Sequence, residues 1–162
     1  MRRIIRQREI VQDGWRYPAA NAPAASGDAG PVALTLAEFV AAAPAAAPGS
    51  LGLWLEPADA VEQAGALIDR ARLVVAHFPK NGEGRGFTQA QLLRQRFGYA
   101  GELRAAGAVK RDQLFFLARC GFDAFDLDPA EDPEDALVAF KTFSVAYQPS
   151  SDPGQRYGGR RF

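Results

Sequence analysis

The sequence predicts an α/β fold, with a mainly parallel sheet of about four strand–helix units and a small β-hairpin at the N-terminus. Short apolar runs alternate with amphipathic stretches from about residue 51 to residue 141, and glycine or proline marks many of the junctions. Strands separated by single helices pair in parallel through right-handed crossovers. An open sheet covered by helices is the first interpretation, and a half-barrel-like arrangement of the same units is the alternative.

The N-terminal segment, residues 4–17, carries β-branched and aromatic residues around Asp13-Gly14. Because this pair readily adopts the positive φ angles of a tight turn, we expect a hairpin with its turn there. Residues 19–31 then consist mostly of alanine, proline, glycine, serine and asparagine. Such a stretch has little apolar surface to bury, which predicts a flexible surface loop.

Thr35 and Glu38 match a capping box and predict a helix that runs to about Ala43. Beyond it, apolar runs and helical periodicity define four strands and four helices. The strands are expected at 51–55, 73–78, 102–106 and 123–127, and the helices at about 59–71, 88–97, 111–120 and 133–141.

Local signals support the helix ends. Thr88 and Gln91 match a second capping box, which places the start of the second of these four helices. Gly121 lies where the third should end, and Asp132-Pro133 places a cap and a first-turn proline at the start of the fourth.

With 162 residues, the chain has the length of one ordinary domain, which we place at residues 1–148. Residues 149–162 are polar and glycine-rich and predict a mobile tail. The formal net charge is zero, which does not favour nucleic acid as a partner. No apolar run approaches the roughly 20 residues of a membrane helix, so no membrane association is expected. A single cysteine suits a cytoplasmic protein, and with one histidine the chain lacks ligands for a metal site of its own.

Ligands of parallel α/β sheets bind at the carboxyl ends of the strands. Cationic residues follow two of the predicted strands, together with a glycine-rich loop and two helix N-termini that offer backbone donors. We therefore predict a site for a small anion, such as phosphate or sulfate, or for a nucleotide. The predicted ligand-binding residues are Lys80, Gly84, Arg85, Gly86, Arg104, Arg111 and Gln113. The alternative is that the glycines only satisfy turn geometry.

Two residues are candidate catalytic groups. Asp112 opens a predicted helix, where it serves either as an acid or base or simply as a cap. Cys120 is a candidate nucleophile, although an unpaired cysteine in an apolar helix is also typical of a core residue. His77 lies inside an apolar strand and is interpreted as structural. The glycine-rich loop has Phe87 where the dinucleotide fingerprint needs its third glycine, so the cofactor stays unknown.

The segments FPK, GRGFT, LLR, GELRAAG, RDQLFF and RCGFDAF together resemble one bacterial family, domain of unknown function 934. The resemblance covers nearly the whole chain apart from the loop at 19–31 and the tail. Members of the family are described as oxidoreductases involved in sulfite reduction, and they tend to be encoded beside assimilatory sulfite reductase. The resemblance therefore implies a role in assimilatory sulfite or sulfate metabolism.

The leading hypothesis is an accessory protein of sulfur assimilation that binds an oxyanion or nucleotide at the strand ends. One alternative is a small enzyme acting on a sulfur-bearing intermediate, and another is a non-catalytic partner module that docks on sulfite reductase components. Reduction of sulfite requires haem and iron–sulfur centres whose ligation takes several cysteines. Because this chain has one, whether it is an enzyme is left open.

Overall fold

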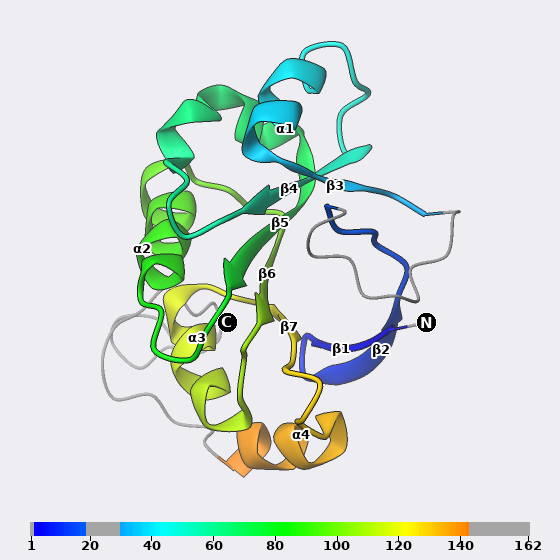
Figure 1. Cartoon of the computed structure of the whole chain (residues 1–162), viewed down its shortest axis with the longest axis vertical. Helices are drawn as coiled ribbons and strands as arrows, with labels where there is room; N and C mark the ends of the chain where they lie inside the picture. The colour runs from blue at the N-terminus through cyan, green and yellow to red at the C-terminus, as the bar shows by residue number, and fades with distance from the viewer. Residues whose placement is uncertain (1, 19–29, 143–162) are drawn as a thin grey trace.

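The computed structural model describes residues 2–18 and 30–142, which form one mixed seven-stranded sheet in the order β2-β1-β7-β6-β5-β4-β3 (Figure 1). Strands β3 to β7 are parallel, and β1 is antiparallel to both of its neighbours, β2 and β7. The strands are β1 Arg2–Arg6, β2 Glu9–Asp13, β3 Ala33–Thr35, β4 Leu51–Leu55, β5 Ala71–Phe78, β6 Glu102–Gly107 and β7 Ala124–Asp126.

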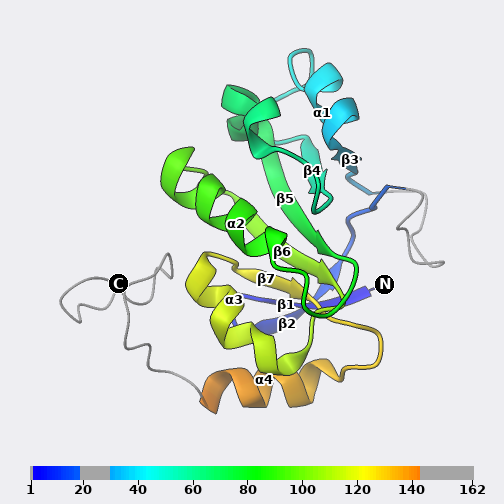
Figure 2. The same cartoon turned by 60° about the vertical axis from the view of Figure 1, so that its left-hand side comes forward.

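The helical segments cover one face of this sheet (Figure 2). They are α1 Leu36–Ala42, η2 Val61–Gln63, η3 Gly65–Arg70, α2 Arg85–Gln91, η4 Leu92–Arg96, η5 Arg111–Gln113, α3 Leu114–Cys120 and α4 Pro133–Thr142. One apolar core holds residues from α1, η2, η3, α2, η4, α3 and α4 together with alternate residues of the strands. Because β3 to β7 follow one another in both sequence and space, the right-handed crossover segments between them all lie on the same face of the sheet. Helices on one face correspond to the half-barrel alternative, and β2 and β3 are the edge strands of the described sheet. The outer side of β3 is partly covered, because Arg16 forms a parallel bridge with Val32 and its carbonyl accepts a hydrogen bond from the N–H of Ala33 at 2.8 Å.

The α/β prediction, the four central strands and the N-terminal hairpin are therefore confirmed in outline. The capping box at Thr35 is present, since the Thr35 N–H and hydroxyl both donate to Glu38 Oε2, at 2.9 and 2.7 Å. Gly121 ends α3 with φ of 112°, a left-handed conformation that favours glycine. Asp132 accepts a hydrogen bond from the N–H of Glu134 in the first turn of α4.

The predicted position of the hairpin turn is wrong. The turn between β1 and β2 is made by Gln7 and Arg8, with φ of 50° and 65°, and Asp13-Gly14 follows the end of β2. Asp13 is drawn into the buried side of the sheet by ion pairs with Arg2 and Arg104, which outweigh its local preference for a turn. The strand β3 was not predicted, because three residues give too short a pattern to recognise.

Two helices also differ from the prediction. The expected helix at 59–71 is two short 3₁₀ segments, and Gly65 lies between them with φ of 50°. The expected helix at 88–97 begins earlier, at Arg85, and continues as a single π-helical turn from residue 92. Gly86 packs directly against the ring of Phe78, and this tertiary contact fixes the helix start upstream of Thr88.

The other face of the sheet carries a smaller apolar cluster around Trp54, Leu73 and Val75, to which Tyr17 adds its ring. The charged residues Asp13, Arg104 and Asp126 are buried beside it. No helix among the described residues is long and apolar enough to cross a membrane. The predicted loop near 19–31 falls mostly outside the described residues, and the tail at 149–162 falls wholly outside them.

Candidate functional site

The loops that follow β5 and β6 are joined at the carboxyl edge of the sheet. The N–H of Ala108 donates to the Phe78 carbonyl at 2.7 Å. The side-chain amide of Gln113 donates to Asn81 Oδ1 at 3.3 Å. The two loops that carry most of the predicted ligand-binding residues therefore lie side by side.

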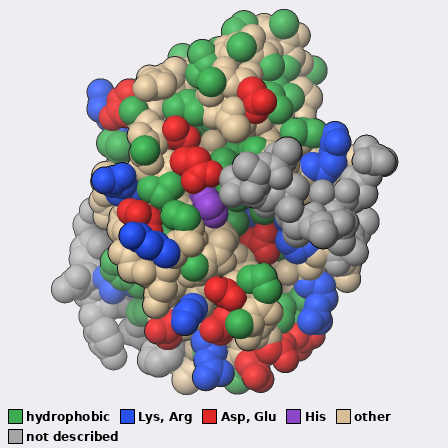
Figure 3. All heavy atoms as spheres, viewed as in Figure 1, with side chains coloured by type: hydrophobic (Ala, Val, Ile, Leu, Met, Phe, Trp, Pro, Cys, Tyr) green, Lys and Arg blue, Asp and Glu red, His purple; other side chains and the backbone are tan. Residues whose placement is uncertain are grey.

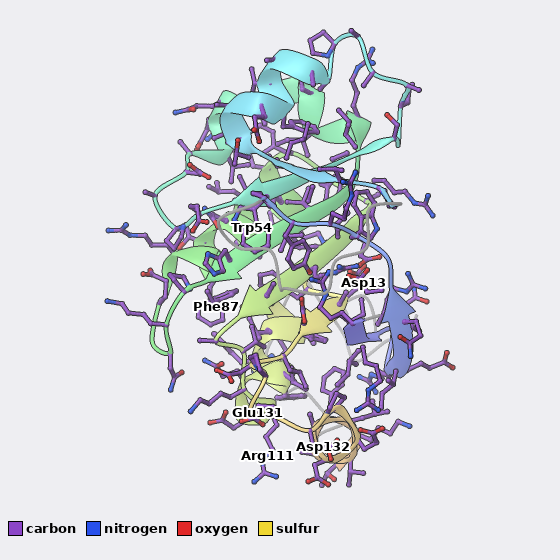
Figure 4. The ribbon with its side chains drawn as sticks, turned by 45° about the vertical axis from the view of Figure 1, so that its right-hand side comes forward. Asp13, Trp54, Phe87, Arg111, Glu131 and Asp132 are labelled. Carbon is purple, nitrogen blue, oxygen red and sulfur yellow. The ribbon has the colours of Figure 1, made fainter. Side chains whose placement is uncertain are left out.

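Four cations project from these loops and from the helix starts after them: Lys80, Arg85, Lys110 and Arg111. All four are exposed, and none forms an ion pair with a carboxylate of the described residues. The backbone N–H of Arg111 donates to Glu131 at 3.3 Å, so one acidic group already lies nearby. Figure 4 shows the Arg111 side chain extending away from the ribbon at the end where Glu131 and Asp132 lie.

The two predicted glycines differ in their surroundings. A Cβ at Gly84 would meet nothing within 4 Å, and this residue caps the N-terminus of α2. A Cβ at Gly86 would lie 2.5 Å from Cζ of Phe78, so close packing against that ring accounts for this glycine.

The structure places Arg104 away from the exposed cations. It is fully buried on the face of β6 that the helices do not cover. Its Nη1 lies 3.0 Å from Asp13 Oδ2 and 3.1 Å from the Tyr17 hydroxyl, and its Nη2 lies 2.6 Å from Glu102 Oε1. Two carboxylates therefore offset its charge inside the protein.

The candidate catalytic residues Asp112 and Cys120 lie near opposite ends of the η5–α3 segment. Asp112 is exposed, whereas Cys120 is 5% exposed at the last position of α3. Seven residues lie between them, and eight steps of helical rise separate the two by about 12 Å, so they do not meet at one reacting atom. Burial raises the pKa of the Cys120 thiol, and the nearby charge of Arg119 only partly opposes that effect.

A carboxylate–imidazole pair lies at the ends of the adjacent strands β4 and β5. Glu56 directly follows β4 and His77 is the penultimate residue of β5, and the distance from Glu56 Oε2 to His77 Nδ1 is 2.8 Å. The His77 side chain is 15% exposed and that of Glu56 is 40% exposed. Figure 3 shows the one histidine of the chain at the molecular surface, with acidic side chains beside it.

Three neighbouring residues hold this pair in place. Trp54 Nε1 donates to the second carboxylate oxygen of Glu56 at 2.8 Å, and the centroid of its ring lies 4.9 Å from that of the imidazole. The buried side chain of Gln89 donates to the carbonyls of Glu56 and Asp59, which ties the turn after β4 to α2. A Cβ at Gly107, which has φ of 107°, would lie 2.4 Å from the Phe78 carbonyl oxygen and 2.9 Å from the His77 ring, so a glycine there leaves room for both.

Further along the same face lies a buried polar cluster, which consists of Arg2, Asp13, Tyr17, Glu102, Arg104 and Asp126. The Tyr17 hydroxyl donates to Asp126 Oδ2 at 2.9 Å, and Arg2 Nε lies 3.1 Å from the same oxygen. Burial raises the pKa of Asp126, and the positive charge of Arg2 opposes this rise. Burial likewise raises the pKa of Tyr17, so its hydroxyl stays protonated.

His77 was expected to be structural, and the sequence does contain a weak signal for its pairing with Glu56. Both residues fall at the carboxyl ends of predicted strands that are consecutive in the chain. Neighbouring parallel strands bring such ends together. The pairing could have been found only with the strand order, which the sequence does not specify. No group of three or more histidine, cysteine or acidic side chains placed to hold a metal ion occurs in the described part of the chain.

Comparison with protein families gives one match. Residues 52–156 match the model of the family described as bacterial proteins of unknown function, DUF934. The chain belongs to this family. The match includes β5, β6 and all of β4 except its first residue, and therefore the Glu56–His77 pair and the cationic loops of this DUF934 protein. A search of curated proteins found no match.

Proposed function

We propose that this DUF934 protein is an accessory protein of assimilatory sulfur metabolism, and that it binds a small oxyanion or an oxyanion-bearing nucleotide at the carboxyl edge of its sheet. The observation that carries the proposal is the set of exposed cations Lys80, Arg85, Lys110 and Arg111. They lie on two joined loops and have no ion-pair partner among the described carboxylates. The sulfur context comes from the resemblance of the sequence motifs.

Physical considerations favour this edge for an anion. Exposed cations that form no internal ion pair keep their charge available to a ligand, whereas Arg104 and Arg94 have carboxylate partners of their own. Gln113 and Asn81 link the two loops through their side chains, which limits how far the cations can separate. Such preorganisation lowers the entropy lost on binding.

The test is a binding series with purified full-length protein. Sulfite, sulfate, phosphate and adenosine 5′-phosphosulfate are added separately, and the thermal midpoint and heat of binding are measured. A ligand at 100 times its Kd stabilises the folded state by about 2.7 kcal/mol and so raises the midpoint. A variant with all four cations changed to glutamine should lose this rise.

The matched control changes Arg72 and Arg96 to glutamine. These two arginines are also exposed, but they lie toward the amino edge of the sheet, Arg72 at the start of β5 and Arg96 at the end of η4, before the chain enters β6. The control should retain binding at the same ionic strength. If none of the four anions raises the midpoint, or if both variants bind as the wild type does, the proposal is wrong.

A second candidate function is a partner module of sulfite reductase, and an exposed aromatic residue favours it. Phe116 is 53% exposed on α3, and its ring lies 5.0 Å from that of Phe87. Exposed aromatic side chains often anchor protein interfaces. Analytical size exclusion with sulfite reductase subunits would test this function, and a Phe116→Ser variant should abolish any complex that forms through this surface.

A further inference from the structure

We propose that Glu56 and His77 form a general acid–base pair, in which His77 Nε2 accepts a proton from an O–H group held at the carboxyl ends of β4 and β5. The pair itself follows from the geometry. The choice of an oxyanion-bearing molecule as the source of that O–H rests on the function proposed above.

The carboxylate determines which nitrogen of His77 carries the proton. An ionised glutamate only accepts hydrogen bonds, so Nδ1, 2.8 Å from Glu56 Oε2, must be the N–H donor. In the neutral imidazole the lone pair then lies on Nε2. Among the described residues Nε2 has no hydrogen-bond partner.

The surroundings keep this arrangement fixed. Trp54 donates to the other oxygen of Glu56, which prevents the carboxylate from rotating freely. Gln89 fixes the backbone of the same turn from the helix side. Acid–base sites in enzymes recurrently contain a base, a partner that orients the base, and a third group that orients the partner. His77, Glu56 and Trp54 have this arrangement.

The proposed step is a proton transfer. The O–H bond of the bound group breaks, its electron pair remains on the oxygen, and an N–H bond forms at Nε2. The resulting imidazolium lies beside the Glu56 carboxylate, whose negative charge stabilises it. The reverse transfer returns the proton to an oxygen of the product, and no oxidant or reductant is needed.

Because the chain has one histidine, its spectroscopic and chemical signals are unambiguous. Long-range ¹H–¹⁵N spectra of the full-length protein, recorded where the imidazole is neutral, should show Nδ1 protonated and Nε2 unprotonated. Diethyl pyrocarbonate, which acylates an unprotonated imidazole nitrogen, should modify His77 in the folded protein. Sulfate or adenosine 5′-phosphosulfate should slow this modification if either occupies the site.

Glu56→Gln is the informative variant. A glutamine amide can donate to Nδ1, which shifts the proton to Nε2 and should slow acylation by on the order of tenfold. Glu56→Asp should partly restore the wild-type rate and tautomer. Glu62→Gln is the matched control, because Glu62 is an exposed carboxylate that pairs with Arg96 and should leave both readouts unchanged.

Urea unfolding would confirm that each variant folds. If His77 shows a protonated Nε2 in the wild type, or if the folded wild type and Glu56→Gln are acylated at equal rates, the proposed pair is wrong. If the tautomer and the rates are as expected but no anion protects His77, the pair is supported and the proposed oxyanion at this site is not. The two proposals therefore fail in distinguishable ways.

Discussion

Arg104 of β6 and Asp13 of β2 form a 3.0 Å ion pair across two intervening strands, β7 and β1. In a flat sheet three strand spacings would separate β2 from β6 by about 14 Å. The contact therefore requires the sheet to curve toward the face that the helices leave uncovered. Curvature at this end encloses the polar cluster and attaches the N-terminal hairpin to the parallel strands.

Arg104→Met should destabilise the protein strongly. The substitution removes the partner of Asp13 and Glu102 inside the protein, and breaking a buried ion pair from one side costs about 3–5 kcal/mol. Urea unfolding monitored by tryptophan fluorescence would measure the loss. Arg6→Met is the control, because Arg6 reaches the same Glu102 from an exposed position and its loss should cost under about 1 kcal/mol. Equal losses in the two variants would contradict the role assigned to Arg104.

Gly86→Ala should destabilise the protein, whereas Gly84→Ala should be tolerated. The added methyl at Gly86 would lie 2.5 Å from the Phe78 ring, and overpacking of this kind costs about 1–3 kcal/mol. The same methyl at Gly84 meets nothing within 4 Å. Thermal unfolding of the two variants gives the comparison, and Phe78→Leu in the Gly86→Ala background should recover part of the loss. Equal stability of the two variants would show that Gly86 is not a packing residue.

The stability of Asp126→Asn relative to wild type should increase as the pH rises from about 4 to 7. Burial raises the pKa of Asp126 in the folded state, so the folded wild type holds this proton after the unfolded chain has released it. The contribution of this carboxyl group to the stability of the wild type is therefore fully present below the pKa of the unfolded chain, around 4. It is lost as the pH rises through the pKa of the folded state. Asparagine does not titrate, and its amide oxygen can still accept the bond from Tyr17. Urea unfolding at several pH values would check the trend, and the opposite trend would show that Arg2 outweighs burial.

Cys120 should react slowly with thiol reagents in the folded protein. It is 5% exposed and its pKa is raised by burial, so little thiolate is present and access is restricted. The rate of reaction with 5,5′-dithiobis(2-nitrobenzoic acid) should rise sharply in denaturant. A folded-state rate close to that of the unfolded protein would instead favour Cys120 as a nucleophile.

Much of the fold could be predicted from the sequence because the relevant signals are local. The strand at 51–55 is apolar enough to predict its limits, and the capping box at Thr35 satisfies its own backbone donors. The predictions failed where a distant contact outweighed local preference. Phe78 moves the start of α2 to Arg85, and the ion pair with Arg104 holds Asp13 outside the turn.

The candidate site was harder to predict, because several of its residues also depend on contacts between distant parts of the chain. Lys80, Arg85 and Arg111 lie in the loops and helix starts that come after two strand ends, so the rule for parallel sheets predicts their edge. The side chain of Arg104 points to the face opposite the helices, and the sequence alone does not identify its partners on the distant hairpin. The Glu56–His77 pair depends on β4 lying beside β5, which is a property of the whole topology.

The strand order also has a consequence for how the chain folds. From β3 to β7 each strand pairs with the next one along the sequence, so this part of the sheet can assemble by successive short-range additions. The pairing of Ile5 with Phe125 joins opposite ends of the domain, and the entropy of closing that long loop is lost in one step. The N-terminal hairpin should therefore be the last element to dock during folding and the first to detach under stress.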